Sequence, residues 1–112
     1  MAEVLKFDSV LLGATQEIAA TIGERDGNTI TVSSVAVYIA DPDGNLLRNG
    51  VAGTVTGSGT ATPMVSYIET FSTGNGYVAG EVYTVEFRAS ISAGTYYEVR
   101  QGTVRVDNSL SG

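Results

Sequence analysis

The sequence predicts an all-β protein, an immunoglobulin-like two-sheet β-sandwich of seven to eight strands, with a small closed β-barrel as the alternative. Three observations predict this fold class. Apolar and polar residues alternate in several short runs, which is the period of a half-buried strand. Clusters of turn-forming residues separate these runs at intervals of roughly ten residues. Glycine occurs 14 times, and tight turns between strands favour it because it tolerates positive φ.

Length and composition indicate one folded domain over residues 1–112. Hydrophobic residues make up 43% of the chain, enough for a packed core. Cysteine and histidine are both absent, which excludes disulfides, thiol and imidazole catalysis and ordinary zinc sites. We expect the N-terminal segment 1–12 and the tail 107–112 to be mobile, because chain ends are the parts most easily reordered.

The charge balance argues against nucleic acid and membranes as partners. The formal net charge is −6, whereas a phosphate-backbone binder needs clustered basic residues. The N-terminus lacks a signal-peptide pattern, and no stretch approaches the ~18–20 apolar residues of a membrane-spanning helix. The six basic residues are scattered: Lys6, Arg25, Arg48, Arg88, Arg100 and Arg105.

Two strands are expected before the first polar loop. Glu3–Asp8 forms a short strand with Leu5 and Phe7 on one face. Gln16–Ile22 alternates in the same way, although its alanines leave a helix as the alternative. Residues 9–12 are apolar and show no clear period.

The clearest strand ends at Ala40. Its apolar residues change parity at Ser33-Ser34, after Ile30 and Val32. A parity change inside a continuous strand indicates a bulge or a bend, and bent strands commonly pass from one sheet to the other. The inward residues after the change are Val35, Val37 and Ile39.

The segment Asp41-Pro42-Asp43-Gly44-Asn45 then reverses the chain. Asp41, Asp43 and Asn45 place three oxygen-bearing side chains within five residues, as part of a calcium loop would. A further acidic ligand is missing, since no residue from 46 to 54 is acidic. Every residue of the segment is a turn former in its own right, so a β-turn is the favoured interpretation and calcium the alternative.

The second half predicts four further strands. Leu46–Val55 is a weak strand interrupted by glycines, and Pro63 marks a strand start or edge. A strand follows in which Glu69 interrupts an apolar face, and a turn at residues 72–76 ends it. Its apolar residues are Val65, Tyr67 and Phe71.

Two long strands complete the chain. In Gly80–Ala89 the inward residues are Tyr83, Val85, Phe87 and Ala89. The last strand begins with Tyr97 and Val99 facing inward. Its parity then changes at Gln101-Gly102, which predicts a second bulge before Val104 and Val106.

Acidic and tyrosine side chains are the candidate functional residues. Glu81, Glu86 and Glu98 could form an acid–base pair, but paired carboxylates need a cleft between them, and a solvated strand face explains them better. We therefore expect no enzyme activity. Tyr83 and Tyr97 fall on inward parity. The candidate interface residues, which are outward, in loops or near the N-terminus, are Leu5, Phe7, Tyr38, Tyr77 and Tyr96.

Residues 76–106 resemble the C-terminal half of small tailed-phage virion proteins described as fibre–tail adaptors. The matching motifs are A-G-E-x-Y-T-V at Ala79–Val85, A-G at Ala93-Gly94 and V-R-V at Val104–Val106, with E-V-L at Glu3–Leu5 and I-T-V-S-S at Ile30–Ser34 placed as in that group. The D-P-D-G-N hairpin departs from the adaptor pattern. The A-G-x-x-Y-x-V-x-F pattern also occurs in immunoglobulin-like modules of bacterial surface proteins.

The resemblance implies a non-enzymatic virion structural protein, made in the host bacterial cytoplasm. It would bridge larger tail or head components and contact other virion proteins and copies of itself in a symmetric oligomer, with no cofactor. The alternative function is an adhesive or carbohydrate-binding module, calcium-dependent if Asp41 and Asp43 bind the ion.

Overall fold

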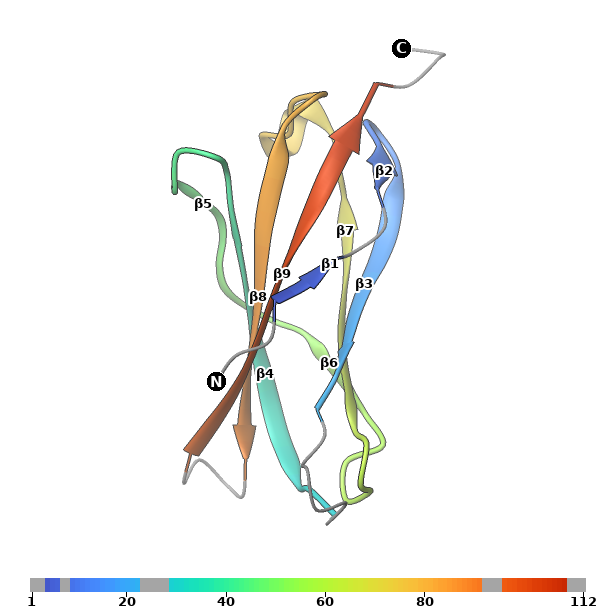
Figure 1. Ribbon diagram of the computed structural model, residues 1–112, viewed down its shortest axis with the longest axis vertical. Helices are drawn as coiled ribbons and strands as arrows, with labels where there is room; N and C mark the ends of the chain where they lie inside the picture. The colour runs from blue at the N-terminus through green and yellow to red at the C-terminus, as the bar shows by residue number, and fades with distance from the viewer. Residues whose placement is uncertain (1–3, 7–8, 23–28, 92–95, 109–112) are drawn as a thin grey trace.

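The computed structural model describes residues 4–6, 9–22, 29–91 and 96–108, and within them the chain forms two β-sheets (Figure 1). The larger sheet has the order β1-β9-β8-β4-β5, with β2 also paired to β9, and the smaller sheet has the order β3-β7-β6. The strands are β1 (Val4–Lys6), β2 (Val10–Leu11), β3 (Thr15–Thr21), β4 (Val32–Ala40), β5 (Leu46–Ala52), β6 (Thr54–Thr56), β7 (Met64–Thr70), β8 (Val82–Ile91) and β9 (Tyr96–Asp107).

This arrangement confirms the predicted two-sheet sandwich. The barrel alternative is wrong, because the described strands form separate sheets. The short segments β1 and β2 both run parallel to β9, and if they are counted as one edge strand, the described residues form eight strands. A single 3-10 turn, η1 (Thr73–Asn75), lies between β7 and β8. No helix in the described part is long and apolar enough to cross a membrane.

The core lies between the two sheets and is built mainly from the residues that alternation selected. The buried side chains come from alternate positions along β8 and along β4 from Val35 onward. The strand prediction for Gln16–Ile22 is confirmed as β3, whose Ile18 and Ala20 face the core. The largest fully buried side chains are Tyr77, Tyr83, Phe71, Phe87, Ile22, Ile39 and Ile91.

The bulge or bend predicted at Ser33-Ser34 is confirmed as a break in strand register. The register between β4 and β8 shifts between Val32 and Ser34. Before the shift, the chain contacts the β6–β7 connection of the other sheet, where Ile30 bridges to Thr60. The shift allows Ile30 and Val32 to be buried although their parity differs from that of the strand that follows.

The weak strand predicted over Leu46–Val55 is two strands in different sheets. β5 pairs with β4, β6 pairs with β7, and Gly53 connects them. The N–H group of Gly53 still donates to the carbonyl oxygen of Val35 on β4 (3.0 Å). The chain therefore crosses between sheets at a residue with no side chain.

The bulge predicted at Gln101-Gly102 is wrong. β8 and β9 pair without a shift from Val82 opposite Arg105 to Ile91 opposite Tyr96. Because directly opposed residues share a face, Tyr97 points to the outer side together with its partner Ser90, and its side chain is 59% exposed. Tyr97 was expected in the core. The prediction was wrong because the inward position before Val104 is Gly102, which has no apolar side chain. The sequence pattern therefore did not show that the inward positions of β9 are the even-numbered ones.

Tyr83 is buried as predicted, and its hydroxyl anchors the start of β8. The backbone N–H of Val78 donates to the Tyr83 hydroxyl oxygen at 2.7 Å, the arrangement of the tyrosine corner found in immunoglobulin-like sandwiches. The ring also packs edge-on against Tyr77, with centroids 4.8 Å apart.

We expect Tyr83→Phe to lower the free energy of unfolding by about 1 kcal/mol, because the N–H of Val78 then loses its acceptor. Urea denaturation measures this loss. Tyr97→Phe is the control, since that exposed ring holds no such bond among the described contacts and its removal should leave the midpoint unchanged. Equal midpoints for both variants would show that the tyrosine corner does not contribute to stability.

Candidate functional site

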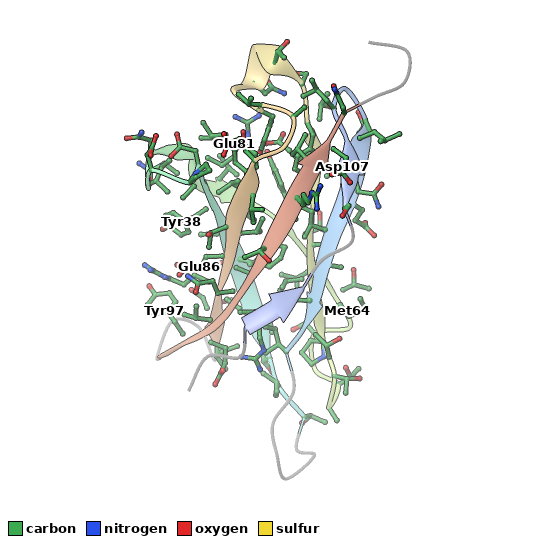
Figure 2. The ribbon with its side chains drawn as sticks, turned by 45° about the horizontal axis from the view of Figure 1, so that its top comes forward. Tyr38, Met64, Glu81, Glu86, Tyr97 and Asp107 are labelled. Atoms are coloured by element: carbon green, nitrogen blue, oxygen red, sulfur yellow. The ribbon has the colours of Figure 1, made fainter. Side chains whose placement is uncertain are left out.

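The outer face of the large sheet carries a hollow of about 160 Å³ around Tyr38. The side chains come from all four of its long strands, and Figure 2 shows Tyr38 and Glu86 on the same side of the molecule. These residues alternate with the buried ones, so the pattern that fills the core also places them outward. The lining residues are Tyr38, Ala40, Leu46, Thr84, Glu86 and Gln101.

Tyr38 is half-buried and held on two sides. The guanidinium of Arg88 lies 5.1 Å from the centre of its ring, within the range of a cation–π contact. On the other side, a β-carbon at Gly50 would lie 3.3 Å from the Tyr38 hydroxyl oxygen. Gly50 also has a φ of 73°, which a residue with a side chain rarely adopts. This glycine therefore lets β5 approach the ring.

The charged groups at this hollow are paired with one another. Arg88 donates to Glu86 at 3.2 Å, and the Gln101 amide donates to the same carboxylate at 3.5 Å. The result is an aromatic ring beside an apolar wall, Ala40 and Leu46, with an amide and a carboxylate at its rim. Such a surface can bind an extended side chain or a sugar ring through stacking and hydrogen bonds.

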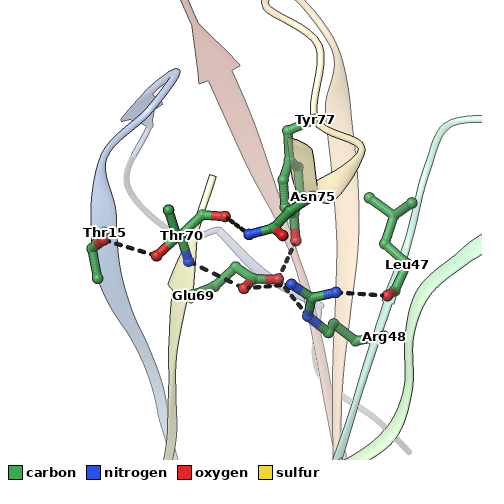
Figure 3. Close-up of polar contacts among 7 residues, drawn as sticks. All are labelled: Thr15, Leu47, Arg48, Glu69, Thr70, Asn75 and Tyr77. Carbon is green, nitrogen blue, oxygen red and sulfur yellow. Dashed lines mark hydrogen bonds and ion pairs between the residues drawn. The ribbon is translucent and has the colours of Figure 1, made fainter. Parts of the chain in front are cut away.

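A second polar cluster lies between the sheets (Figure 3). The carboxylate of Glu69 on β7 is 3% exposed and pairs with Arg48 on β5, at 2.8 Å to Nε and 2.9 Å to Nη2. It also accepts from the hydroxyl of Tyr77 at 2.8 Å and from the backbone N–H of Thr70 at 3.1 Å. Arg48 further donates to the carbonyl oxygen of Leu47 at 3.0 Å. This cluster, the Glu69 clamp, ties an edge strand of the large sheet to the small sheet.

The Glu69 clamp shows that the expectation for Tyr77 was wrong. Tyr77 was a candidate interface residue because it follows a turn, but its side chain is 1% exposed. The ring packs between Phe71 and Tyr83, tilted against the first and edge-on to the second, with both centroids 4.8 Å away. Its hydroxyl finds a charged acceptor inside the protein, which makes burial of a tyrosine favourable. Tyr77 is therefore a core residue.

Burial and the bond to Glu69 together raise the pKa of Tyr77 above its ordinary value of 10.0. In the unfolded chain the phenol loses its proton as the pH passes about 10, whereas the folded protein keeps it. The unfolded state then binds fewer protons, so the free energy of unfolding falls as the pH rises above about 10 and is unaffected by this group below that pH.

We expect Tyr77→Phe to flatten this alkaline loss of stability. Urea denaturation at several pH values between about 8 and 11 measures the slope. The variant is less stable near neutral pH, since it lacks one hydrogen bond to a charged group, yet its stability should depend less on pH above 10. Parallel slopes for both proteins would mean that Tyr77 titrates normally.

The other candidate interface residues are placed only in part. Leu5 lies in β1, where its backbone is opposite Gly102, and Tyr96 opens β9 opposite Ile91. The side chains of both, and the whole of Phe7, lie outside the described residues. Of the five candidates, Tyr38 alone is placed on an open face by the described side chains.

The Asp41–Asn45 segment forms the predicted turn between β4 and β5. The N–H groups of Asp43 and Asn45 donate to Oδ1 of Asp41 at 3.0 and 2.8 Å. The Asn45 amide approaches Oδ2 at 3.4 Å, so the turn itself uses both carboxylate oxygens. Among the described residues no group of three or more acidic, histidine or cysteine side chains could hold a metal. Calcium here stays the untested alternative.

The three acidic candidates for acid–base work are not brought together. Glu86 points outward, whereas Glu98 lies opposite the buried Ala89 and so on the inner side of the sheet. Each pairs with its own arginine: Glu86 with Arg88 at 3.2 Å and Glu98 with Arg100 at 3.1 Å. Glu81 is exposed in the connection before β8.

Sequence reasoning missed Glu69 as a structural residue. It treated this glutamate as an interruption of an apolar face. The signal was present, however, because Glu69 shares the inward parity of Val65 and Phe71, and a carboxylate at an inward position requires a buried cation or donor. Nothing in the local sequence identified Arg48 as that cation.

No protein-family model and no curated protein sequence matches this chain. A solved structure described as "Structures of Clostridium thermocellum CbhA fibronectin(III)-like modules" is similar in fold, with a TM-score of 0.50 and 14% sequence identity over 97% of each chain. At that identity the likeness concerns the fold alone. The chain is an all-β, immunoglobulin-like sandwich with the architecture of a fibronectin III-like module.

Proposed function

We propose that this protein is a non-catalytic structural module of a tailed-phage virion, where it joins larger components through surface contacts. The adaptor-like motifs at residues 76–106 support the virion setting. The immunoglobulin-like fold supports a module that acts by binding, although such folds host many functions. The separate positions of Glu81, Glu86 and Glu98 support a role without acid–base chemistry.

The observation that carries this proposal is the position of Tyr38. Its ring borders a hollow on the outer face of the large sheet and is held by Arg88 and by contact with β5. A tyrosine that is fixed before binding gives contact area with little loss of side-chain entropy. The partner would insert a side chain between the ring and Leu46.

Two measurements test the proposal. Mass spectrometry of density-banded particles from the source culture should detect the chain in fixed proportion to major particle proteins. The immobilised chain should then capture a particle protein from disrupted particles, and Tyr38→Ser should weaken that capture about tenfold, as loss of an interface tyrosine does. Tyr97→Ser, an exposed tyrosine away from the hollow, is the matched control. Absence of the chain from particles would refute the virion role.

The composition of the hollow favours a second candidate, a carbohydrate-binding module. An aromatic ring with a carboxylate and an amide beside it can stack on a sugar and bond to its hydroxyl groups. Titration of neutral oligosaccharides, with and without millimolar calcium, would move the NMR signals of Tyr38 and Gln101 if this function holds. Unmoved signals at millimolar sugar exclude it.

A further inference from the structure

In the part of the chain that the structure describes, the small sheet has three strands, one fewer than the usual immunoglobulin arrangement. In constant-type domains this sheet has four strands, and the first strand of the chain pairs with the second. Here the N-terminal segments β1 and β2 pair with β9 of the other sheet. Among the described strands, β3, which would receive the missing partner, pairs with β7 alone, and it lies at the margin of the molecule in both views (Figures 1 and 2).

The backbone groups on the open side of β3 belong to its odd-numbered residues. At the two ends of the β3–β7 ladder, the N–H of Ile22 donates to Pro63 at 2.7 Å and Ala14 accepts from Phe71 at 2.8 Å. The even-numbered residues therefore bond to β7, and the odd-numbered ones point away from it. On that open side, the contact described is from Arg100 to the carbonyl oxygen of Thr21 at 3.2 Å.

The other sheet edges are protected in ways that β3 is not. β1 and β2 cover part of β9. β5 meets β4 through two register shifts, and β6 has only three residues. Bulges and short strands are common devices against edge pairing. β3 runs for seven residues in unbroken register, so it can pair with a further strand along its length.

The outer face next to this edge is poor in charge although the protein carries a net charge of −6. Its described residues on β3, β7 and β6 include one ionisable side chain, Glu17. Ile68 and Met64 are 63% and 43% exposed there. Depletion of charge around exposed apolar side chains is typical of the centre of a protein interface. The remaining outward residues are Thr15, Ala19, Thr21, Thr54, Thr56, Ser66 and Thr70.

We propose that β3 pairs antiparallel with β3 of a second copy, about a two-fold axis at Ile18, to form one continuous sheet across two molecules. This register places Glu17 opposite Ala19 and Thr15 opposite Thr21 of the other copy. It joins odd-numbered residues to odd-numbered ones, so the open donors and acceptors meet each other. The Thr21 carbonyl can keep Arg100, because a carbonyl oxygen has two lone pairs.

Charge favours this register over the one whose two-fold axis lies at Glu17. An axis at Glu17 would set two carboxylates directly opposite each other, which destabilises a strand pair, whereas the axis at Ile18 sets each carboxylate against a methyl group. The strand is thus complementary to itself in the way that a two-fold interface requires. The inference goes beyond the proposed function and does not depend on it, because that function uses the opposite face of the sandwich.

Sedimentation equilibrium of the full chain, from micromolar to millimolar concentration, tests the inference. The wild type should show a monomer–dimer equilibrium. Ala19→Glu should weaken it about tenfold, because each copy then sets a second carboxylate against Glu17 of the other. Ala19→Lys should tighten it by a similar factor, since the same position then carries the opposite charge. Ser34→Glu, an exposed change on the large sheet with the same added charge, should leave the dimer unchanged.

Hydrogen exchange distinguishes this interface from any other dimer. The backbone N–H groups of Glu17 and Ala19 should exchange more slowly as the concentration rises, because only strand pairing at this edge protects them. A wild type that stays monomeric at millimolar concentration would overturn the proposal and leave the edge to a strand from a different protein. Equal effects of Ala19→Glu and Ala19→Lys, or concentration-independent exchange, would also overturn it.

Discussion

Replacing Glu69 by alanine is expected to lower the free energy of unfolding by about 3–5 kcal/mol, the range for breaking a buried ion pair on one side. The substitution removes the acceptor for Arg48, for the Tyr77 hydroxyl and for the N–H of Thr70. Arg48 has 23% of its side chain exposed, so it regains some water, but the Tyr77 hydroxyl does not. The guanidinium also loses a two-pronged contact that raises its pKa.

A double variant that replaces both Arg48 and Glu69 separates the contribution of the ion pair to stability from that of the contacts around it. Arg48→Met with Glu69→Met replaces both charges by apolar side chains of similar length, and such replacements are often neutral or stabilising. We therefore expect the double variant to be clearly more stable than Glu69→Ala. Urea denaturation of the wild type, both single methionine variants and the double variant gives the coupling energy. Purely additive losses would mean that the Glu69 clamp does not act as a unit.

Gly53→Ala is expected to be the next most harmful change, at about 1–3 kcal/mol, because it overpacks the point where the chain crosses between sheets. A β-carbon there would lie 2.8 Å from Cγ1 of Val35, 2.9 Å from the carbonyl oxygen of Ser66 and 3.0 Å from Cγ2 of Val37. The carbonyl belongs to the backbone of β7 and the valines to β4, so neither side can yield without moving a strand.

Gly74→Ala is the matched control for this prediction. Neither glycine needs a positive φ, and a β-carbon at Gly74 would meet only the hydroxyl oxygen of Ser72, at 3.9 Å. Both substitutions reduce the freedom of the unfolded chain to a similar extent, so the difference between their unfolding free energies reports the steric contact. Equal stability of the two variants would show that the two sheets can move apart at Gly53 without a loss of unfolding free energy.

Alternation predicted the core rows correctly where a strand runs unbroken in a fully apolar register. The inward sets of β4 and β8, the bend at Ser33-Ser34 and the turn at Asp41–Asn45 are all as expected. The reason is that strand period and turn chemistry are local properties, which a few consecutive residues determine. Tyr38, the tyrosine of the candidate site on β4, was predicted to face outward because alternation within its own strand places it there.

The features that the sequence did not predict depend on which strands are neighbours. Tyr97 is outward because its register with β8 is unbroken, and Tyr77 is inward because Glu69 and Phe71 lie beside it. The hollow needs Gln101 from β9 and Leu46 from β5 next to Tyr38, and the clamp needs Arg48 from the opposite sheet.

By itself, therefore, the sequence determined the fold class, the main strands and one turn, because each of these depends on periodicity within a single segment. The tertiary structure alone decided which polar groups meet, which edge of the small sheet the described strands leave open, and which face each described tyrosine side chain shows. These depend on pairing between segments far apart in the chain, where a shift of one residue exchanges the two faces of a strand.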